Sequence, residues 1–465
     1  MFIPENFKEE KALVIGAGKS GIAAANLLAA KGFRVFLTEN SPAEKVKDRL
    51  KELSPSVEIE TGGHTDAVFS CGFAVKCPGL SHKNPLLLRL EQKGMPVFSE
   101  VEAALSFAKS PHLIAITGTN GKTTTTMLLG GIMKIHAAAN GAEALTAGNI
   151  GNPVAAAVYG EAAGSFITAE LSSYQLEDSS FIKPEVSVIL NITPDHLEHH
   201  GSMEAYIAAK KRIFLFQDKN SFCVLNRRDM ICRKIAEDVP SKVLWFSSSE
   251  KAESDNAINA FIKDGFLVFR NGGKKHTLKP PVLPGIHNME NAIAAGLAAL
   301  AAGAKPQEIQ QAFDAFRPVE HRIEPAGTVK GIKFINDSKA TNVDSVIVAL
   351  KAMPQEKTTW LILGGRDKGA PYSPLIPLIR ERVKGMIIIG EAAPLIEKEL
   401  ASCAPYKKAA DIYEACRMIL ACGKAGDMAL FSPACSSFDQ FKDYEDRGRR
   451  FKKYVKELSD GESQG

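Results

Sequence analysis

Short apolar runs recur along the chain, and each is followed by a polar or glycine-bearing loop and then by a segment with helical spacing of apolar positions. Near the start, residues 11–15 and 33–38 are such runs, with a helix-compatible segment through Lys31 between them. Residues 73–76 continue the alternation, and 96–108 has the pattern of a final strand and helix. Strands that alternate with helices predict a doubly wound parallel sheet, so this part is expected to be Rossmann-like.

The alternation continues through the middle of the chain and restarts after Arg317-Pro318. In the middle, the pattern predicts strands at 165–171, 185–191, 221–226 and 242–246, a helix at 202–216 and a hairpin at 265–278. In the last part it predicts strands at 332–335, 359–363 and 428–431. We therefore predict an α/β protein with mostly parallel sheets in three domains: Rossmann-like at 1–110, a central phosphate-loop ATPase domain at 111–317, and Rossmann-like again at 318–465.

Composition narrows the classes of partner. Lys plus Arg exceed Asp plus Glu by only 57 to 53, so the polybasic field that drives nucleic-acid binding is missing. Residues 1–11 carry charges where a signal peptide needs an apolar core, and the alanine-rich run at 292–304 is too short to span a bilayer. The eight cysteines are scattered without a Cys-x-x-Cys pair, which indicates buried free thiols. A cytoplasmic protein without nucleic-acid or membrane partners is expected.

The apolar run 114–116 leads into Thr117-Gly118-Thr119-Asn120-Gly121-Lys122-Thr123, just before a helix-compatible segment. The glycines let backbone N–H groups converge on phosphate oxygens, Lys122 supplies a charge for the outer phosphates, and the hydroxyl of Thr123 suits Mg²⁺. The run therefore predicts a nucleoside triphosphate site, although its loop is shorter than the common one. The alternative is a Gly- and Thr-rich turn that only caps a helix.

A second glycine turn, Gly16-Ala17-Gly18-Lys19-Ser20-Gly21, follows the first predicted strand, and Glu39 stands at the tip of the next strand. This dinucleotide fingerprint, taken alone, suggests NAD. It requires only a tight turn and a helix N-terminus that faces an anion, so any diphosphate fits. Because another nucleotide loop lies downstream, we expect a different phosphate-bearing ligand here, with Lys19 and Ser20 at its diphosphate and Thr38 and Glu39 near its nucleoside.

Two strands of the middle part end in residues with ligand chemistry. Residues 166–169 lead to Glu170, and 189–194 lead to Asp195-His196. Ligands bind at the carboxyl edge of parallel strands, so Thr123, Glu170 and His196 are expected to meet around the triphosphate. A helix cap or a surface carboxylate is the alternative for Glu170.

Residues 195–210, which follow the second of these strands, raise two further questions. A zinc site at 195–200 is disfavoured because no cysteine is near, and His199 and His200 are expected to be solvated. Lys210 follows in the next predicted helix. Charge alone argues against its approach to Mg²⁺, because an ammonium group has no acceptor.

Polar side chains also gather at later element ends. Asn288 and Asn291 stand one turn apart at the start of an alanine-rich helix, where they can reach one ligand or cap the helix. In the last part, polar loops follow three strands, at 336–342, 364–368 and 432–437. Lys339, Lys368 and the serine hydroxyls of these loops suit a small carboxylated molecule. The charged amphipathic helix at 441–458 is expected to be a solvated cover.

Together these motifs resemble the Mur ligase family of ATP-dependent, amide-forming enzymes of peptidoglycan precursor synthesis. The resemblance covers essentially the whole chain and includes the phosphate loop, Gly148-Asn149-Ile150-Gly151, Glu170-Leu171-Ser172-Ser173, Asp195-His196, Ala208-Ala209-Lys210, His287-Asn288 and His321-Arg322. Runs 171–177, 336–342 and 432–435 resemble the family member that adds D-glutamate. The chain lacks the Asp-Asn-Pro-Arg run of the diaminopimelate-adding relative.

The resemblance implies that ATP phosphorylates the carboxylate of UDP-N-acetylmuramoyl-L-alanine, and that the amine of D-glutamate then attacks the acyl phosphate. It implies ATP and two Mg²⁺ ions as cofactors, with a carbamate on Lys210 whose oxygens can bind Mg²⁺. The first glycine turn, beginning at Gly16, would hold the UDP part rather than NAD, and Asn149 would contact the muramoyl end. A monomer is expected.

The resemblance also implies a role for each motif residue. Catalysis is assigned to Lys122, Glu170, His196 and Lys210, and metal binding to Thr123, Glu170, His196 and Lys210. ATP binding is assigned to Gly118, Thr119, Asn120, Gly121, Lys122, Thr123, Thr124, Asn288, Asn291, Arg322 and Asp337. The UDP-sugar is assigned to Gly16, Lys19, Ser20, Thr38, Glu39 and Asn149, and D-glutamate to Lys339, Thr341, Lys368, Ser436, Ser437 and Tyr444.

Three other functions fit parts of the sequence. A folylpolyglutamate synthetase-like glutamate ligase shares the ATP site, but such enzymes normally begin with the ATPase domain. An NAD-dependent dehydrogenase with an accessory ATPase domain would retain NAD on purification. A nucleotide-binding regulator without catalysis is disfavoured by the ligand-like loops of the last domain.

Overall fold

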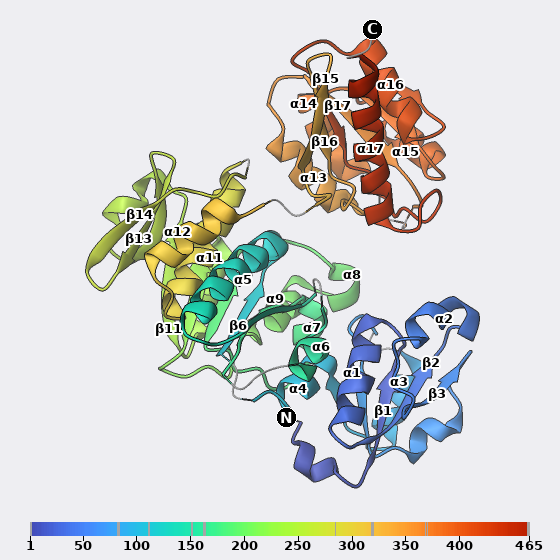
Figure 1. Cartoon of the computed structure of the whole chain (residues 1–465), viewed down its shortest axis with the longest axis vertical. Coiled ribbons are helices and arrows are strands. Elements are labelled where there is room, and N and C mark those ends of the chain that lie inside the picture. Colours follow the sequence, from blue (N-terminus) through green and yellow to red (C-terminus); the bar gives the residue numbers. More distant parts are fainter. Residues whose placement is uncertain are drawn as a thin grey trace. The chain divides into compact units, whose positions relative to one another are not determined.

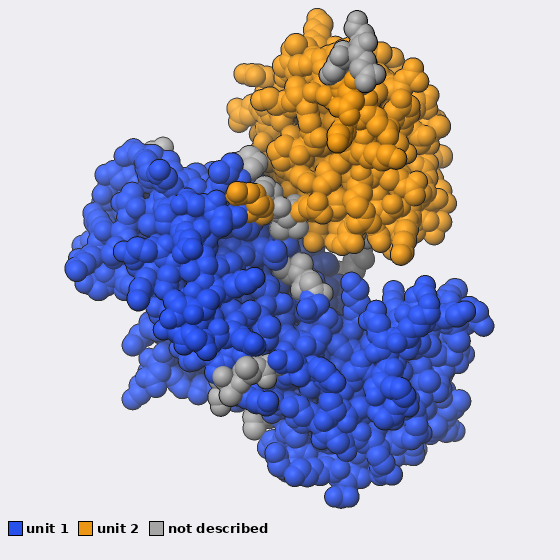
Figure 2. All heavy atoms as spheres, in the orientation of Figure 1, with its two compact units in different colours: residues 1–316 blue, residues 317–465 orange. Residues whose placement is uncertain are grey.

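The computed structural model describes residues 2–80, 84–109, 112–149, 152–160, 164–283, 285–317, 320–367, 369 and 371–462. The chain divides into two compact units, residues 1–316 and residues 317–465 (Figure 2). Within the described residues, the first unit contains a five-stranded and a nine-stranded sheet, and the second unit contains a six-stranded sheet.

The first sheet is parallel throughout, with strand order β3-β2-β1-β4-β5, as in a Rossmann-like domain (Figure 1). The last four residues of β1 are buried, as a central parallel strand with both faces covered requires. The hydrophobic pattern does not predict β3, whose Glu-Ile-Glu-Thr sequence lies at the sheet edge and stays partly exposed. The strands are β1 Lys11–Ile15, β2 Arg34–Glu39, β3 Glu58–Thr61, β4 Phe73–Lys76 and β5 Val97–Ser99, and the helices are α1 Lys19–Ala30, α2 Ala43–Leu50, α3 Pro85–Gln92 and α4 Glu100–Leu105.

The second sheet has the order β14-β13-β12-β11-β10-β9-β6-β8-β7. Its pairs from β7 to β12 are parallel, whereas β12, β13 and β14 pair antiparallel, which includes the predicted hairpin. The strands are β6 His112–Thr117, β7 Ala144–Gly148, β8 Phe166–Glu170, β9 Val186–Ile189, β10 Phe222–Asn226, β11 Lys242–Ser247, β12 Ile258–Lys263, β13 Phe266–Asn271 and β14 Lys274–Leu278.

Helices α11 and α12 of this part both pack against α5, the helix that follows the phosphate loop (Figure 1). The predicted helix at 202–216 is shorter in the structure and ends at Lys211, because Ile213 and Phe214 turn into the core and are fully buried. The helices are α5 Lys122–Ala139, α6 Val154–Tyr159, α7 Ser173–Glu177, α8 Leu197–His200, α9 Met203–Lys211, α10 Met230–Ile235, α11 Ile286–Ala301 and α12 Pro306–Ala315.

The sheet of the second unit has the order β15-β16-β20-β17-β18-β19. Only the β15–β16 pair of this sheet is antiparallel, so the predicted Rossmann-like, mostly parallel arrangement is confirmed. The strands are β15 Glu324–Val329, β16 Ile332–Asn336, β17 Thr359–Gly364, β18 Val383–Ile389, β19 Tyr406–Lys408 and β20 Met428–Phe431, and the helices are α13 Val343–Ala352, α14 Ile376–Arg382, α15 Ala393–Leu400, α16 Ile412–Cys422 and α17 Tyr444–Glu462.

One hydrophobic core joins the first two sheets. Phe73 and Val101 of the first sheet region and Leu113, Val154 and Leu171 of the second belong to the same buried cluster. The two N-terminal predicted domains therefore share one compact unit. The predicted boundaries at 110/111 and 317/318 stay predictions, since residues 110, 111 and 318 lie outside the described ranges.

The eight cysteines carry free thiols, and all except Cys77 and Cys422 are buried. The prediction of free thiols without a disulfide framework is confirmed. Within the described residues, no helix combines the length and the apolar character that crossing a bilayer requires.

Candidate functional site

The phosphate loop joins β6 to α5 at the carboxyl edge of the central sheet. Gly121, the residue before α5, has a φ of 85°, a left-handed conformation that glycine adopts without strain. The loop is fastened to the chain after β9. The N–H of Thr119 donates to the carbonyl of Asn191 (2.9 Å), and the N–H of Asn120 donates to Oδ1 of Asn191 (2.8 Å). Strand, glycine turn and long helix thus occur in the predicted order.

Lys122 is the first residue of α5, and its Nζ donates to the carbonyls of Gly118 and Thr119, both at 2.8 Å. The amine therefore lies over the loop, where phosphate oxygens can replace these carbonyls. Thr123 and Thr124 follow in the first turn, whose backbone N–H groups lack intrahelical partners and attract anions. The loop thus gathers an amine and the N–H groups of a helix N-terminus at one point, which favours the phosphate-site interpretation.

Lys210, near the end of α9, lies against the same loop. Its side chain is 1% exposed, and Nζ donates to the carbonyl of Gly118 (2.8 Å) and to Oγ1 of Thr117 (3.4 Å). Burial, together with the positive charge of Lys122, brings the pKa of Lys210 well below its ordinary value. The structure therefore brings the two predicted catalytic lysines together at the carbonyl of Gly118, and burial makes the charged form of Lys210 less favourable.

Glu170 ends β8 and is 1% exposed. Its Oε1 accepts a hydrogen bond from Nδ2 of Asn149 (3.0 Å), whereas Oε2 is buried without a hydrogen-bond partner among the described residues. A buried carboxylate oxygen is costly unless a cation or a water satisfies it. Glu170 is not a surface carboxylate, and Ser172 rather than Glu170 caps α7. Neither alternative interpretation of Glu170 holds.

His196 stands at the start of α8 with a left-handed φ of 52°. Its Nδ1 lies 3.3 Å from the hydroxyl of Tyr174, and its Nε2 lies 3.4 Å from Oδ2 of Asp195. The side chain is 45% exposed. The imidazole is thus partly exposed on a turn, and its contact to a ligand stays a prediction.

The expectation that His199 and His200 are solvated is wrong. The side chain of His200 is 0% exposed and that of His199 is 15% exposed. Burial lowers the pKa of His200; Glu177 raises it, and the charges of His199, His196 and Lys210 lower it again. The sequence pattern cannot reveal this burial, because it arises where α8 meets the distant helix α7.

Asn288 and Asn291 are buried in the first turns of α11. Nδ2 of Asn291 donates to Oδ1 of Asn288 (3.3 Å), and a Cβ added to Gly121 would collide with Oδ1 of Asn291. The residue before α11 is Gly285, which makes no side-chain cap. The asparagines therefore lie against the phosphate loop, which favours the ligand interpretation over helix capping.

The first glycine turn joins β1 to α1. Gly16 has a φ of 99°, and a Cβ on Gly21 would collide with the carbonyl oxygen of Gly16. Glu39 reaches back from β2, and its Oε2 accepts the N–H of Ala17 (2.7 Å). Burial raises the pKa of Glu39, but the N–H groups of Ala17 and Ser41 outweigh burial and hold it below its ordinary value. The carboxylate of Glu39 thus accepts a hydrogen bond from one N–H group of this turn, that of Ala17.

The other residues assigned to the UDP-sugar lie around this turn. Lys19 and Ser20 open α1, and Lys19 is exposed. The hydroxyl of Thr38 is buried and contacts Oε1 of Glu60 (2.6 Å) and Nδ1 of His64 (2.7 Å). Their contacts to a ligand stay predictions.

In the second unit, Asp337 follows β16 and is buried. Its Oδ2 accepts the hydroxyl of Ser432 (2.7 Å), and its Oδ1 accepts the N–H of Ile323 (3.2 Å). Burial raises the pKa of Asp337 to about 7, although Ser432, Arg322 and the N–H of Ile323 act to lower it. The two predicted ATP contacts of this unit, Arg322 and Asp337, are thus electrostatically coupled.

The loop after β16, which is assigned to D-glutamate, lies beside the start of α17. Nζ of Lys339 lies 5.6 Å from the ring centre of Tyr444, and the N–H of Thr341 donates to the carbonyl of Lys339 (2.9 Å). The hydroxyl of Tyr444 contacts Oε1 of Glu445 (3.2 Å). This neighbourhood combines a cation, a hydroxyl and an aromatic face, which a carboxylated ligand can use.

The serines assigned to D-glutamate follow β20. Ser436 and Ser437 are buried, and the hydroxyl of Ser436 donates to the carbonyl of Arg366 (3.0 Å). That contact ties the loop after β20 to the loop after β17. Lys368, which is also assigned to D-glutamate, lies outside the described residues.

Arg447 of α17 contacts two of these loops, and sequence reasoning missed it. It is 1% exposed; Nε donates to Oγ of Ser338 (3.0 Å), and Nη2 donates to the carbonyls of Ser338 (2.8 Å) and Cys435 (3.1 Å). Burial lowers its pKa to about 10. The predicted charged amphipathic helix is present as α17; its exposed face carries charges, whereas Phe451 and Val455 are buried. Only the amphipathic spacing of α17 hints at its buried face.

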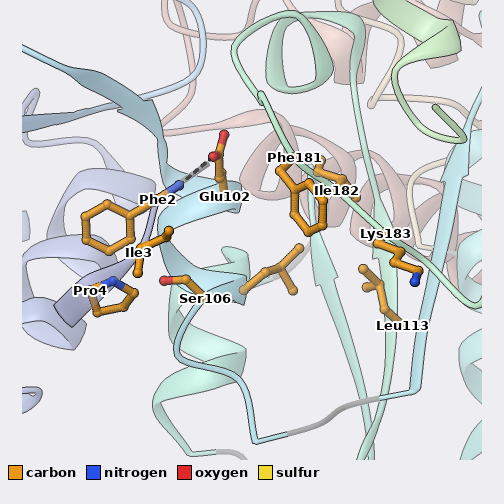
Figure 3. A pocket seen from close by; sticks show the side chains of 10 residues that line it. Phe2, Ile3, Pro4, Glu102, Ser106, Leu113, Phe181, Ile182 and Lys183 are labelled. Carbon is orange, nitrogen blue, oxygen red and sulfur yellow. Dashed lines mark hydrogen bonds between the residues drawn. The ribbon is translucent and has the colours of Figure 1, made fainter. Parts of the chain in front are cut away.

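A cavity of about 370 Å³ lies elsewhere in the first unit, at the start of β6 (Figure 3). Its lining includes Leu113, whereas the phosphate loop follows the other end of the same strand. The two oxygens of Glu102 already accept the N–H groups of Phe2 (2.8 Å) and Ser180 (2.6 Å). None of the predicted site residues lines this cavity.

Comparison with known proteins agrees with this arrangement. Family models match three successive segments: the Mur ligase MurD-like N-terminal domain at 10–99, the Mur ligase middle domain at 116–299 and the Mur ligase glutamate ligase domain at 321–435. A protein from Elusimicrobium minutum, named UDP-N-acetylmuramoylalanine--D-glutamate ligase, is 46% identical over 461 residues, which is 98% of this chain and 100% of that protein. The chain belongs to the Mur ligase family. A second protein with that name, from Koribacter versatilis, is 39% identical and covers 97% of this Mur ligase.

Solved structures share the fold of this Mur ligase. The UDP-N-acetylmuramate-alanine ligase from Thermotoga maritima has a TM-score of 0.61 at 19% identity and covers 96% of this chain and 99% of its own. A pseudomurein peptide ligase type C from Methanothermus fervidus has a TM-score of 0.59 at 19% identity, over 97% of this chain and 100% of its own. The predicted three-domain α/β fold and family resemblance are confirmed. As a Mur ligase, the chain is an ATP-dependent enzyme that forms amide bonds.

Proposed function

We propose that this Mur ligase joins the alanyl carboxylate of UDP-N-acetylmuramoyl-L-alanine to the amine of D-glutamate and converts ATP to ADP and phosphate. The observation that carries this proposal is end-to-end similarity, at 46% identity, to a ligase named for that reaction. The glutamate ligase family model over 321–435 supports it independently. The reaction is a step of peptidoglycan precursor synthesis. The folylpolyglutamate synthetase-like alternative is not favoured.

The chemistry divides into two transfers. A carboxylate oxygen of the alanyl group attacks the γ-phosphorus of ATP, the bond to the β–γ bridging oxygen breaks, and ADP leaves. The amine of D-glutamate then attacks the acyl carbon, loses a proton, and expels inorganic phosphate. No side-chain nucleophile is needed, so the enzyme contributes positioning and charge. Lys122, which already lies over the phosphate loop, is suited to stabilise the transferring phosphoryl group.

The residues near the loop fit a divalent cation. Oε2 of Glu170 has no hydrogen-bond partner among the described residues, so it can serve as a metal ligand. Thr123 adds a hydroxyl group, and His196 adds an exposed imidazole. Mg²⁺ held by these residues would neutralise charge on the phosphates. Assignment of two ions and of these ligands rests on the family resemblance.

A carbamate on Lys210 is part of the proposal. The lone pair of an uncharged amine can attack carbon dioxide, form an N–C bond and release a proton, which leaves an anion with two oxygens. The lowered pKa of Lys210 supports this reaction, because burial eases the loss of the proton that frees the lone pair. The modification removes the objection that an ammonium cannot approach Mg²⁺.

The remaining contacts follow from the two glycine turns and the loops of the second unit. We assign the UDP part to Gly16, Lys19, Ser20, Thr38 and Glu39. Asn149 donates to Glu170 in the structure, so a muramoyl contact would link the sugar end to the metal ligand. D-Glutamate is assigned to Lys339, Thr341, Lys368, Ser436, Ser437 and Tyr444. ATP as substrate supports the cytoplasm as the place of reaction, and the enzyme is proposed to act as a monomer.

The deciding experiment measures phosphate release from ATP with UDP-N-acetylmuramoyl-L-alanine and one amino acid at a time. D-Glutamate is expected to give phosphate and a new amide product, whereas L-glutamate, L-lysine and diaminopimelate give neither. A parallel reaction with a folate and L-glutamate tests the alternative ligase. Turnover with the folate, or with diaminopimelate in place of D-glutamate, contradicts the proposal.

A further inference from the structure

Glu177, His199 and His200 bring three potential metal ligands together at the ends of two short helices. Glu177 ends α7, and the two histidines end α8. One ligand atom from each residue lies within 4.8 Å of the others, a grouping found within the described side chains. Nε2 of His199 is 2.7 Å from Oε2 of Glu177, and Nδ1 of His200 is 3.6 Å from the same oxygen.

The ring of His200 is held in one orientation by a second residue. Its Nε2 lies 3.0 Å from Oγ of Ser173, which is itself buried. In the tautomer in which Nε2–H donates to that hydroxyl, Nδ1 carries the lone pair. A metal-binding histidine is commonly oriented in this way, through a hydrogen bond from the nitrogen that does not bind the ion.

The free nitrogen of His200 is the strongest sign of a ligand. The side chain is 0% exposed, and Nδ1 has no hydrogen-bond partner among the described residues. It faces Oε2 of Glu177 at 3.6 Å, and in the tautomer with its lone pair on Nδ1 the two atoms repel each other. A cation bound to Nδ1 removes this repulsion and can share Oε2, which also contacts Nε2 of His199.

Tyr174 forms one wall of this cluster. Its ring centre lies 4.3 Å from that of His199 and 5.7 Å from that of His200. Glu177 is 28% exposed, so the opposite side is open to solvent. A cation can therefore enter past Glu177 and keep a water ligand.

We propose that Glu177, His199 and His200 form a site for a divalent transition-metal ion of the Zn²⁺ type. Two imidazole nitrogens and one carboxylate oxygen, with a position left for water, are a common ligand set for Zn²⁺. Mg²⁺ prefers oxygen ligands, so this ligand set selects against it. The site is separate from the residues assigned to Mg²⁺, which are Thr123, Glu170, His196 and Lys210.

Binding has a structural consequence. The ion would join α7 to α8 and hold Tyr174 beneath His196, whose Nδ1 is 3.3 Å from the tyrosine hydroxyl. The folded protein would bind the ion more tightly than the unfolded chain, because the ligands come from two helices that only the fold brings together. Zn²⁺ is therefore expected to raise the melting temperature.

The test is a calorimetric Zn²⁺ titration of the chelator-treated full chain in excess Mg²⁺, which keeps other oxygen sites occupied. The wild type is expected to bind one Zn²⁺ per chain. Glu177→Gln, His199→Gln and His200→Gln are each expected to weaken binding about tenfold or more. The matched control is His112→Gln, which breaks another His–carboxylate pair, with Glu185 at 2.8 Å, and should leave Zn²⁺ affinity unchanged.

Two further variants keep the outcome decisive. Ser173→Ala retains all three ligands and should weaken Zn²⁺ binding and reduce the Zn²⁺-induced rise in melting temperature, even if a ligand variant fails to fold. His196→Gln should retain Zn²⁺ affinity. Absence of stoichiometric binding to the wild type overturns the proposal. Binding that is lost in His196→Gln but kept in His199→Gln also overturns it, because the ion would then occupy the residues assigned to Mg²⁺.

Discussion

In the first unit, one glycine turn joins β1 to α1 and another joins β6 to α5, each at the carboxyl edge of a parallel sheet. Both turns contain a glycine with positive φ directly after or near the strand, and both present a helix N-terminus. They differ in the charges that surround them. The first turn receives the carboxylate of Glu39 on the N–H of Ala17, whereas the second receives the amines of Lys122 and Lys210 on the carbonyl of Gly118.

The residues behind each turn extend this difference. Behind the first turn, the thiol of Cys77 lies 3.4 Å from the carbonyl of Gly16, and burial raises the pKa of Cys77 to about 12. Beside the second lies Glu170, with one unpartnered carboxylate oxygen. The second turn therefore suits a highly charged phosphate chain with a cation, and the first suits a less charged ligand with hydroxyl groups. The surrounding charges, more than the glycine pattern, decide which anion each turn accepts.

The largest expected effect comes from removing the amine of the second turn. Lys122→Ala should lower kcat by about 10²- to 10³-fold, because it removes a fixed charge from the transferring phosphoryl group. Binding of UDP-N-acetylmuramoyl-L-alanine, measured by calorimetry, should change little. The matched control is Lys19→Ala in the first turn, which should leave the KM for ATP unchanged. Equal effects of the two variants on ATP would abolish the distinction between the turns.

Lys210→Ala is expected to lower kcat by about 10²-fold, because the proposed carbamate oxygens are lost. A short-chain carboxylate such as propionate can enter the space left by the side chain, so it should restore part of the activity. Steady-state phosphate release with and without propionate measures this rescue. Unchanged turnover in the variant without any addition would show that Lys210 has no catalytic role.

A smaller effect is expected at the first turn. Glu39→Gln should weaken binding of UDP-N-acetylmuramoyl-L-alanine about tenfold, because a charge-assisted hydrogen bond to a ligand hydroxyl becomes a neutral one. The KM for ATP should stay constant. Isothermal titration with the UDP-substrate is the measurement. Tighter binding by the variant would mean that the carboxylate only closes the turn and repels the diphosphate.

The last prediction concerns stability rather than activity. Glu100, at the start of α4, is 1% exposed, and burial raises its pKa to about 7, against the N–H of Ala155, which lowers it. Its protonated form therefore contributes stability that is fully present below the unfolded pKa, near 4.5, and is lost as the pH rises through about 7. Glu100→Gln stays uncharged, so its melting temperature should not fall across this window. The expected difference at pH 8 is on the order of 3 kcal/mol at most. Parallel curves of melting temperature against pH for variant and wild type would contradict it.

Much of the fold could be predicted from sequence because its signals are local. The apolar runs that became β1, β4, β6 and β20 are short and bounded by polar loops, and the glycine turns follow them directly. The edge strand β3 could not be predicted, since its sequence lacks an apolar run. Residues 212–216 were predicted to be helical and are not, because Ile213 and Phe214 are buried in the core.

The residues of the candidate site also divide into those with a local sequence signal and those without one. Lys122 and Glu170 could be found from their place after apolar strands, and Lys210 only through family resemblance. The burial of His200 and the contacts of Arg447 had no sequence signal, because each depends on segments that are distant along the chain. Arg447, for example, contacts Ser338 and Cys435, which are distant from it in the sequence of the second unit. The sequence of α17 alone does not distinguish it from other charged amphipathic helices.

The sequence by itself determined the alternation of strand, turn and helix, the position of both glycine turns and the chemistry available at each. These properties depend on neighbours within a few residues, where hydrophobic period and backbone freedom act. Only the tertiary structure decided which charges meet and which lose their water. It placed Lys210 on the carbonyl of Gly118, left Oε2 of Glu170 without a hydrogen-bond partner within the described part of the chain and brought His200 to Glu177. Burial and charge pairing set the pKa and the ligand affinity of such groups, and both arise only when distant segments pack together.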